Sequence, residues 1–316
     1  MVHRIAAYLL TYNGQRQIDL VHSPDINQVR SNTAGYAQVR DQRPYKNFNA
    51  ILDRANGATG KYHAFTTEVT KRFSQGLSFQ NSYVWAKNLS NANGPAPGGF
   101  SAENGPTTLD YFDIIKDYGD VAFTRRHRFV STFLWELPVG IGRRYANSIS
   151  KLADALVGGW QVAGIVTLQT GPYLTPFFQG GDPSGTGANV RGVQGTQRPD
   201  RIGDGNLTNP TSERYFDRSA FVVPANNIGR FGNAGVGILR GPGTEVFSMS
   251  LAKRFLLTEE VDLRYEATLS NLFNHTNLDI PATLNIGSDS FGRIQATQKG
   301  DLAGPRTIQM SLRISF

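Results

Sequence analysis

The chain closes with RTIQMSLRISF, residues Arg306–Phe316, and this stretch decides the fold. Every second residue in it is apolar: Ile308, Met310, Leu312, Ile314 and Phe316. The residues between them are polar, so the stretch predicts a β-strand with one apolar and one polar face. A strand of this kind exposes its apolar face unless something covers it. The fold must therefore supply that cover.

The composition favours many strands over helices. Among 316 residues there are 34 Gly, 19 Phe and 12 Tyr, and only 18% of residues are charged; this mixture is typical of strands joined by Gly-rich turns. No apolar run approaches the roughly 18 to 20 residues of a membrane-spanning helix, which excludes a helical membrane protein. Cysteine is absent, which excludes disulfides, thiolate metal sites and a cysteine nucleophile. The net charge of +7 is spread along the chain without a nucleic-acid-binding module, so no nucleic acid is expected as a partner.

Nine segments alternate between apolar and polar residues and are predicted as strands: 4–12, 48–53, 62–73, 77–87, 126–137, 160–168, 246–255, 261–271 and 306–316. Polar residues 14–46 predict a connection, and Asn56-Gly57 predicts a turn. Most later connections alternate in length. The long ones are 88–118, 171–243 and 273–303; the shorter ones are 74–76, 138–156 (with a short helix at 149–156) and 256–260.

Long loops on one side, short turns on the other, and strands of about ten residues are typical of an outer-membrane β-barrel. Lipid would then cover the apolar face, with Tyr83 and Trp85 in an aromatic girdle. The opposite face carries charges that suit a water-filled or plugged lumen: Arg72, Arg128, Asp262, Arg264, Glu266 and Arg313. The alternative is a secreted β-sandwich, a carbohydrate-binding or adhesion module, with its apolar faces packed on one another.

Four stretches carry a family resemblance: YHAFTTEVTKRFSQGLSFQNSYVWAKNLS (62–90), FTRRHRFVSTFLWELPVG (123–140), GGWQVAGIVTLQTGPYLTP (158–176) and LRYEATLSNLFNHTN (263–277). Together they resemble the C-terminal barrel region of TonB-dependent outer-membrane receptors, in the Oar-like group that carries an N-terminal carboxypeptidase-regulatory-like domain. The terminal strand is similar to the signal that the barrel-assembly machinery recognises, through Met310, Leu312, Ile314 and Phe316.

This resemblance implies a receptor that imports a bulky nutrient, an oligosaccharide or a metal chelate, across the cell outer membrane. Such receptors have a signal peptide, the regulatory-like domain, a plug that engages the TonB complex, and about 22 strands. We therefore expect residues 1–316 to be the C-terminal part of the barrel, without signal peptide, regulatory-like domain or plug. Outer-membrane lipid and the assembly machinery are its expected partners, and the TonB complex only through the missing plug.

About nine strands cannot close a barrel of this kind. The predicted fold is thus all-β: an open partial transmembrane β-barrel, antiparallel and curved, with long extracellular loops. Its two unpaired edges predict a fragment that is unstable alone and prone to aggregate.

Nothing in the sequence predicts catalysis, a cofactor or a metal site. The histidines, including His127 and His275, are not at metal-ligand spacing, Asp200 and Asp204 depart from a calcium-loop pattern, and no G-x-S-x-G occurs. The chain is thus predicted not to be an enzyme. The candidate ligand-binding residues are aromatic ones in the predicted extracellular loops: Tyr111, Phe112, Tyr173, Phe177, Phe178, Tyr215 and Phe221. Their rings would stack on a ligand or, alternatively, pack the loops against one another.

Overall fold

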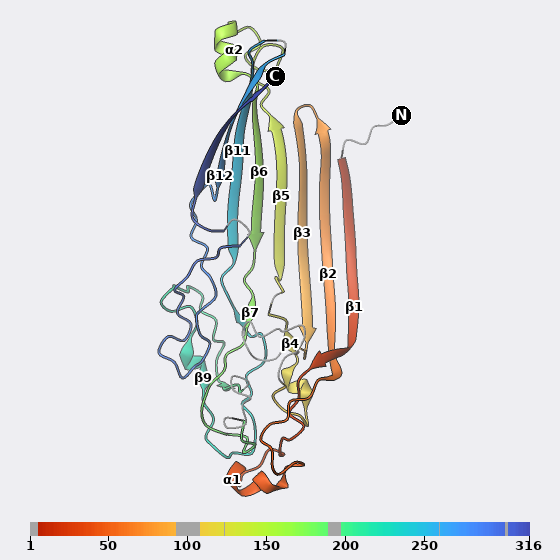
Figure 1. Ribbon diagram of the computed structural model, residues 1–316, viewed down its shortest axis with the longest axis vertical. Coiled ribbons are helices and arrows are strands. Elements are labelled where there is room, and N and C mark those ends of the chain that lie inside the picture. The colour runs from red at the N-terminus through yellow and green to blue at the C-terminus, as the bar shows by residue number, and fades with distance from the viewer. Residues whose placement is uncertain (1–5, 93–107, 123, 189–196, 259, 301–302) are drawn as a thin grey trace.

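A computed structural model describes residues 6–92, 108–122, 124–188, 197–258, 260–300 and 303–316. Parts of the predicted strand 4–12 and of the predicted connections 88–118, 171–243, 256–260 and 273–303 lie outside these residues. The molecule is elongated, with the long strands side by side in one half and the long loops gathered at the other end (Figure 1).

The long strands form one antiparallel sheet in which each strand pairs with the next long strand of the chain. In sheet order they are β1 (Ala6–His22), β2 (Ala55–Ser74), β3 (Leu77–Ser90), β5 (His127–Glu136), β6 (Trp160–Gln169), β11 (Thr244–Leu256), β12 (Asp262–Ser270) and β13 (Thr307–Ser315). The two-residue strand β4 (Gly119–Asp120) pairs with β3 and is the ninth member. In the part of the chain that the structure describes, β1 pairs only with β2 and β13 only with β12. The predicted open antiparallel sheet is confirmed.

The turn between β2 and β3 shows how the short connections are built. Ser74 pairs with Leu77, which leaves Gln75 and Gly76 as a two-residue loop. Both have positive φ, 53° and 77°, as a type I′ hairpin turn requires. The ammonium group of Lys71 donates to the carbonyl oxygens of Ser74 (2.8 Å) and Leu77 (2.7 Å), closing the turn from the side.

The predicted strand 48–53 is wrong. Among the described residues there, only Leu52 forms a bridge, to Asp25. The side chain of Asn27 donates to the carbonyl oxygens of Tyr45, Phe48 and Asn49 at 3.0, 3.0 and 2.6 Å. These bonds bend the backbone where the local alternation predicted an extended segment.

The predicted connection 14–46 is wrong over its first residues, because β1 continues to His22. Gly14 pairs with His63 and Arg16 with Lys61. The predicted turn at Asn56-Gly57 lies inside β2. With these corrections, long and short connections alternate over the whole sheet, because residues 23–54 become one long loop between β1 and β2.

The short elements lie outside the path of long strands. The helices are α1 (Tyr36–Val39), η1 (Arg40–Gln42), η2 (Ile114–Asp117), α2 (Lys151–Val157) and η3 (Arg218–Ala220); the small strands pair as β7 (Tyr173–Leu174) with β10 (Leu239–Arg240) and β8 (Asp200–Arg201) with β9 (Phe221–Val222). The predicted short helix corresponds to α2, where the hydroxyl of Ser150 accepts a hydrogen bond from the Ala153 amide at 3.2 Å. None of the helices in the described residues is long and apolar enough to cross a membrane.

Buried apolar side chains gather at the loop end of the molecule, away from the sheet. The loop core, as we call it, consists of Leu174, Phe178, Phe216, Ala220, Phe221, Leu239, Leu284, Ile286 and Phe291. On the sheet, by contrast, many large apolar side chains point outward and are exposed, up to 67% for Met310. No second sheet covers that face in the described residues, so the predicted sandwich alternative has no support.

Candidate functional site

The outward face of the sheet is a continuous apolar surface set by strand register. Tyr12 lies opposite Phe65, Phe65 opposite Trp85, and Trp85 opposite His127, so one row crosses four strands. The next row toward the short turns contains Leu10, Thr67, Tyr83 and Phe129.

On seven of the long strands the outward residues are mainly apolar over nine positions: 65–73, 77–85, 129–137, 160–168, 247–255, 261–269 and 308–316. The polar exceptions among these outward residues are Thr67, Lys71, Asn81, Ser131 and Lys253. We call this surface the apolar band. A tilted strand needs about 9 to 11 residues to cross the hydrocarbon core of a bilayer. The band therefore has the height that a membrane requires.

The opposite face of the sheet is polar and carries its own hydrogen bonds. Glu68 accepts from the Gln80 side chain at 2.6 Å, and Glu266 accepts from the hydroxyl of Ser250 at 2.9 Å. Arg264 pairs with Glu266 at 3.3 Å and lies directly opposite Arg313. The prediction that Arg264, Glu266 and Arg313 share one face is therefore confirmed, and this face has the polar character of a hydrated barrel interior.

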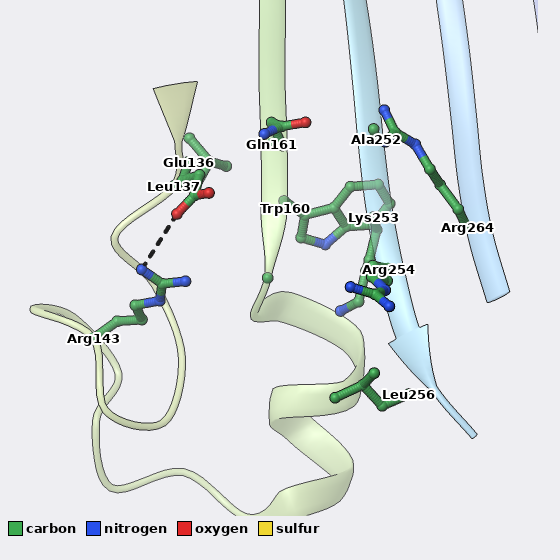
Figure 2. Close-up of a pocket in the computed structure, with 11 residues that line it drawn as sticks. Glu136, Leu137, Arg143, Trp160, Gln161, Ala252, Lys253, Arg254, Leu256 and Arg264 are labelled. Carbon is green, nitrogen blue, oxygen red and sulfur yellow. Dashed lines mark ion pairs between the residues drawn. The ribbon is translucent and has the colours of Figure 1, made fainter. Parts of the chain in front are cut away.

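At the short-turn end, the ends of four long strands and the segment leading into α2 enclose a cavity of about 430 Å³. Figure 2 shows its lining, with the dashed Glu136–Arg143 ion pair at 3.5 Å. The Lys253 ammonium group donates to the Gly158 carbonyl at 2.6 Å, and Arg254 pairs with Asp262 at 2.7 Å. Since its cations already have partners, the cavity needs no ligand to balance charge.

The loop core joins two loops that are far apart in the sequence. The Phe177 amide donates to Leu284 O (3.0 Å) and the Ile286 amide to Phe177 O (2.9 Å). The ring of Phe291 lies 6.3 Å from that of Phe216 and 6.2 Å from that of Phe221. The described residues of 170–188, 197–243, 271–300 and 303–306 therefore fold together as one packed unit.

Most of the candidate ligand-binding residues belong to this unit. Phe178 and Phe221 are buried in the loop core, with Phe177 and Tyr215 packed against it. Tyr173 is also buried, and its hydroxyl accepts from Arg126 Nε at 2.8 Å. These five side chains contribute to the packing of the loops, and Phe177 and Tyr215 remain half-buried. Whether any of them contacts a ligand stays a prediction.

Tyr111 and Phe112 lie apart from the other five and remain exposed, at 41% and 40%. Their rings meet edge to face with centroids 5.1 Å apart, and the guanidinium of Arg30 lies 4.2 Å above the Phe112 ring. We call these three residues the aromatic patch. Its exposed rings and cation suit stacking on a sugar or chelate, and ligand binding there stays a prediction.

A buried ion pair fastens the loops, and the sequence did not predict it. Asp117 Oδ1 lies 3.2 Å from Arg198 Nη1, both side chains are almost fully buried, and Asp117 Oδ2 accepts from the Leu109 amide at 2.8 Å. Arg198 Nη2 also donates to Lys116 O at 2.7 Å. Burial raises the pKa of Asp117 to about 6, against the opposing effect of the Arg198 charge. Their separation of 81 residues left no local signal.

Three of the histidines, His22, His63 and His127, pair with nearby hydroxyl groups. His63 Nδ1 lies 2.7 Å from Tyr12 Oη, and His127 Nδ1 lies 2.8 Å from Tyr83 Oη; in each pair the rings are stacked at 22°. His22 Nδ1 lies 2.8 Å from the Thr108 hydroxyl, and burial lowers its pKa. Over the described ranges, no group of three or more His, Asp or Glu residues is arranged to hold a metal ion.

One family model, described as outer membrane beta barrel domain, matches residues 4–309. Among solved structures, the chain is similar to the outer membrane transporter YddB from Escherichia coli, at 9% identity and a TM-score of 0.45, over 100% of this chain and 31% of that chain. It is also similar to a chain of the FpvAI–pyocin S2 complex, at 9% identity and a TM-score of 0.42, over 99% of this chain and 26% of that chain. The chain thus spans less than a third of the length of either. No curated protein matches it in sequence.

Proposed function

This chain belongs to the outer membrane beta barrel domain family and so lies in an outer membrane, and from that premise we propose that it is part of the barrel wall of a TonB-dependent receptor of the Oar-like group. The receptor would import a bulky nutrient, and the chain would supply the C-terminal part of its barrel. The role is transport and not catalysis.

The open sheet is the observation that carries this proposal. In lipid, every backbone N–H and C=O group must find a partner within the protein, so a sheet with free edges cannot cross a membrane alone. In the described residues both β1 and β13 present such edges. Pairing of these edges with further strands would make the complete barrel wider than these strands could make alone, as a transporter of bulky nutrients requires.

The loop end supports an extracellular orientation. Long loops of outer-membrane barrels face outward and short turns face the periplasm. With this orientation the aromatic patch of Arg30, Tyr111 and Phe112 faces the medium, where it would contact an oligosaccharide or metal chelate. Energy would come from the TonB complex through a plug, and the barrel-assembly machinery would recognise Met310, Leu312, Ile314 and Phe316.

Fluorescence quenching tests the membrane placement. The chain has three tryptophans, and all three lie on the outward face of the sheet, so variants that keep only Trp85, Trp135 or Trp160 report the two margins of the apolar band. In vesicles, where the free edges of copies of the chain can pair with one another, quenchers attached to lipid acyl chains should quench all three, and aqueous iodide should do so weakly. Protection of all three from both quenchers would support a sandwich and contradict the proposal.

Barrel closure is tested separately by heat-modifiable migration on electrophoresis. We expect the chain alone to lack this behaviour, because its edges are unpaired. A chain that migrates as a compact, heat-modifiable species without added strands would show that it closes by itself and would contradict the receptor-fragment proposal.

A further inference from the structure

Three exposed cations lie just beyond the loop-side margin of the apolar band, and we call them the basic rim: Arg16 on β1, Lys61 on β2 and Lys87 on β3. Strand register places them on the outward face. Two residues past the Tyr12–Phe65–Trp85 row, Lys87 lies opposite His63, and two residues further Arg16 lies opposite Lys61. Rows in a sheet are about 6.6 to 6.8 Å apart along the strand, so the rim directly borders the band.

The rim concentrates like charge without a compensating partner of its own. Like charges directly opposite on one face of an antiparallel pair repel each other, as Arg16 and Lys61 do in this sheet. Within the described residues, neither of them nor Lys87 forms an ion pair. The charge of Lys87 interacts with that of Asp120, but Asp120 forms its ion pair with Arg126 at 3.4 Å and also interacts with Arg240. The carboxylate of β1, Asp19, lies in the bulge beyond Gln17.

A cavity opens beside the rim. It has a volume of about 280 Å³ and is lined by Arg16, Thr59, Gly60, Lys61, Ile115 and Tyr118. Two cations thus share it with the exposed side chain of Ile115 and the ring of Tyr118. An anionic group that also carries apolar chains fits this combination, because the anion would relieve the repulsion and the chains would continue along the band.

The opposite margin of the band is built differently. There the ammonium groups of Lys71 and Lys253 donate to backbone carbonyls of the turn and of the segment before β6. Those cations therefore stabilise the protein itself. The two margins would meet different lipid surfaces, and the loop-side margin is the one that offers unpaired positive charge to the outer leaflet.

We propose that the basic rim binds the phosphate groups of a phosphorylated glycolipid of the outer leaflet, with its acyl chains lying against the row of Tyr12, Phe65 and Trp85. Charge-assisted contacts to phosphate are the strong ones on such a surface, and the aromatic row lies at the depth where headgroups give way to chains. The inference rests on the orientation proposed above, with the long loops outside.

The test measures how much lipid A the protein retains. The full chain is reconstituted with lipid A, exchanged into detergent, and the bound lipid is quantified by mass spectrometry. We expect Arg16→Gln/Lys61→Gln/Lys87→Gln to retain at least about tenfold less lipid A than the unchanged chain. The matched control, Lys46→Gln/Lys151→Gln/Lys299→Gln, removes the same charge at exposed positions away from the rim and should retain the normal amount.

Three results would overturn the inference. They are equal retention by the rim variant, equal loss by the control variant, and displacement of lipid A by millimolar inorganic phosphate, which would mean a site for free phosphate. Circular dichroism and Trp135 quenching verify that the rim variant still inserts. If Trp135 is not quenched by lipid in any variant, the proposed function fails; if it is quenched but retention is unchanged, only the glycolipid site fails.

Discussion

The sheet and the loop core handle apolar side chains in opposite ways. On the sheet, large apolar residues such as Met310 and Leu312 are about two-thirds exposed, while in the loop core Phe178 and Phe216 are each 2% exposed. The sheet thus presents its apolar side chains to lipid, whereas the loop end buries its apolar side chains away from water. The difference shows that burial in this molecule has to be judged against two solvents, because an exposed leucine on the band is buried once lipid surrounds it.

The largest expected effect separates the two regions directly. Phe216→Ala removes a buried ring and leaves a cavity, so it should lower the free energy of unfolding of the loop end by about 3 to 5 kcal/mol. Phe65→Ala loses only the transfer term of roughly 1.5 to 3 kcal/mol, since lipid fills the space. Urea titration in vesicles, followed by proteolysis of the loops and by tryptophan emission, gives both values. Equal losses would remove the distinction.

A charge placed on the band sharpens the comparison further. Val69 lies at the centre of the outward run 65–73, so Val69→Arg should cost about 2 to 4 kcal/mol in a bilayer, as at a membrane midplane. The control Thr70→Arg changes the neighbouring residue, which points to the polar face. Folded yield in vesicles should drop for the first variant and stay near normal for the second; the reverse order would mean that the faces are assigned the wrong way round.

The pH dependence of the loop end tests the buried pair of Asp117 and Arg198. Because burial raises the pKa of Asp117 from 3.8 to about 6, its proton is held more tightly in the folded state. The stability that this supplies is fully present below about pH 3.8 and is lost as pH rises through about 6, a change of at most about 3 kcal/mol. Hydrogen exchange of the Leu109 amide should report it.

The variant Asp117→Asn isolates this contribution, since its amide does not titrate. Its loop stability should be flatter than that of the unchanged chain between pH 4 and 6. If instead the unchanged chain gained stability over that range relative to the variant, attraction to Arg198 would outweigh burial, and the pKa of Asp117 would be lowered by folding instead of raised.

The smallest effect concerns the margin where the two regions meet. Tyr83→Phe removes the hydroxyl that lies 2.8 Å from His127 Nδ1, at a cost of about 0.5 to 1.5 kcal/mol. Tyr12→Phe should cost a similar amount, because its pair with His63 has the same ring geometry. Thermal unfolding in detergent resolves a change of this size; an unaffected transition in both variants would make the pairs incidental to the stability of the margin.

The fold could be predicted from sequence in those strands where contact with lipid makes apolar and polar residues alternate. The closing strand and the hairpin of β2 and β3 alternate because one face meets hydrocarbon, and both are strands in the structure. The loop-side end of β1 could not be predicted, since Gln15 and Arg16 lie beyond the band, where both faces are polar although the pairing continues. The false strand at 48–53 shows the reverse error, because Asn27 overrides a chance alternation there.

The candidate site was predictable only in part. Aromatic residues in long loops suggest ligand stacking, but Phe178 and Phe221 lie in a core whose partners come from a second loop, distant in the sequence. The exposed pair Tyr111 and Phe112 fits the prediction better. The sequence did contain a signal for the basic rim. Lys61 and Lys87 occupy the same every-second-residue positions as the outward apolar residues, just beyond the point where those residues end.

The order of strands in the sheet sets the order in which the chain can fold. Every long strand pairs with its successor, so hairpins with short links can form first and then join. The link 257–261 between β11 and β12 has five residues, and the link 170–243 between β6 and β11 has 74. Closing the second loses about 2 kcal/mol more chain entropy. Early formation of the loop core would bring β6 and β11 close together before they pair. A variant that weakens the loop core should then slow the joining of β6 to β11.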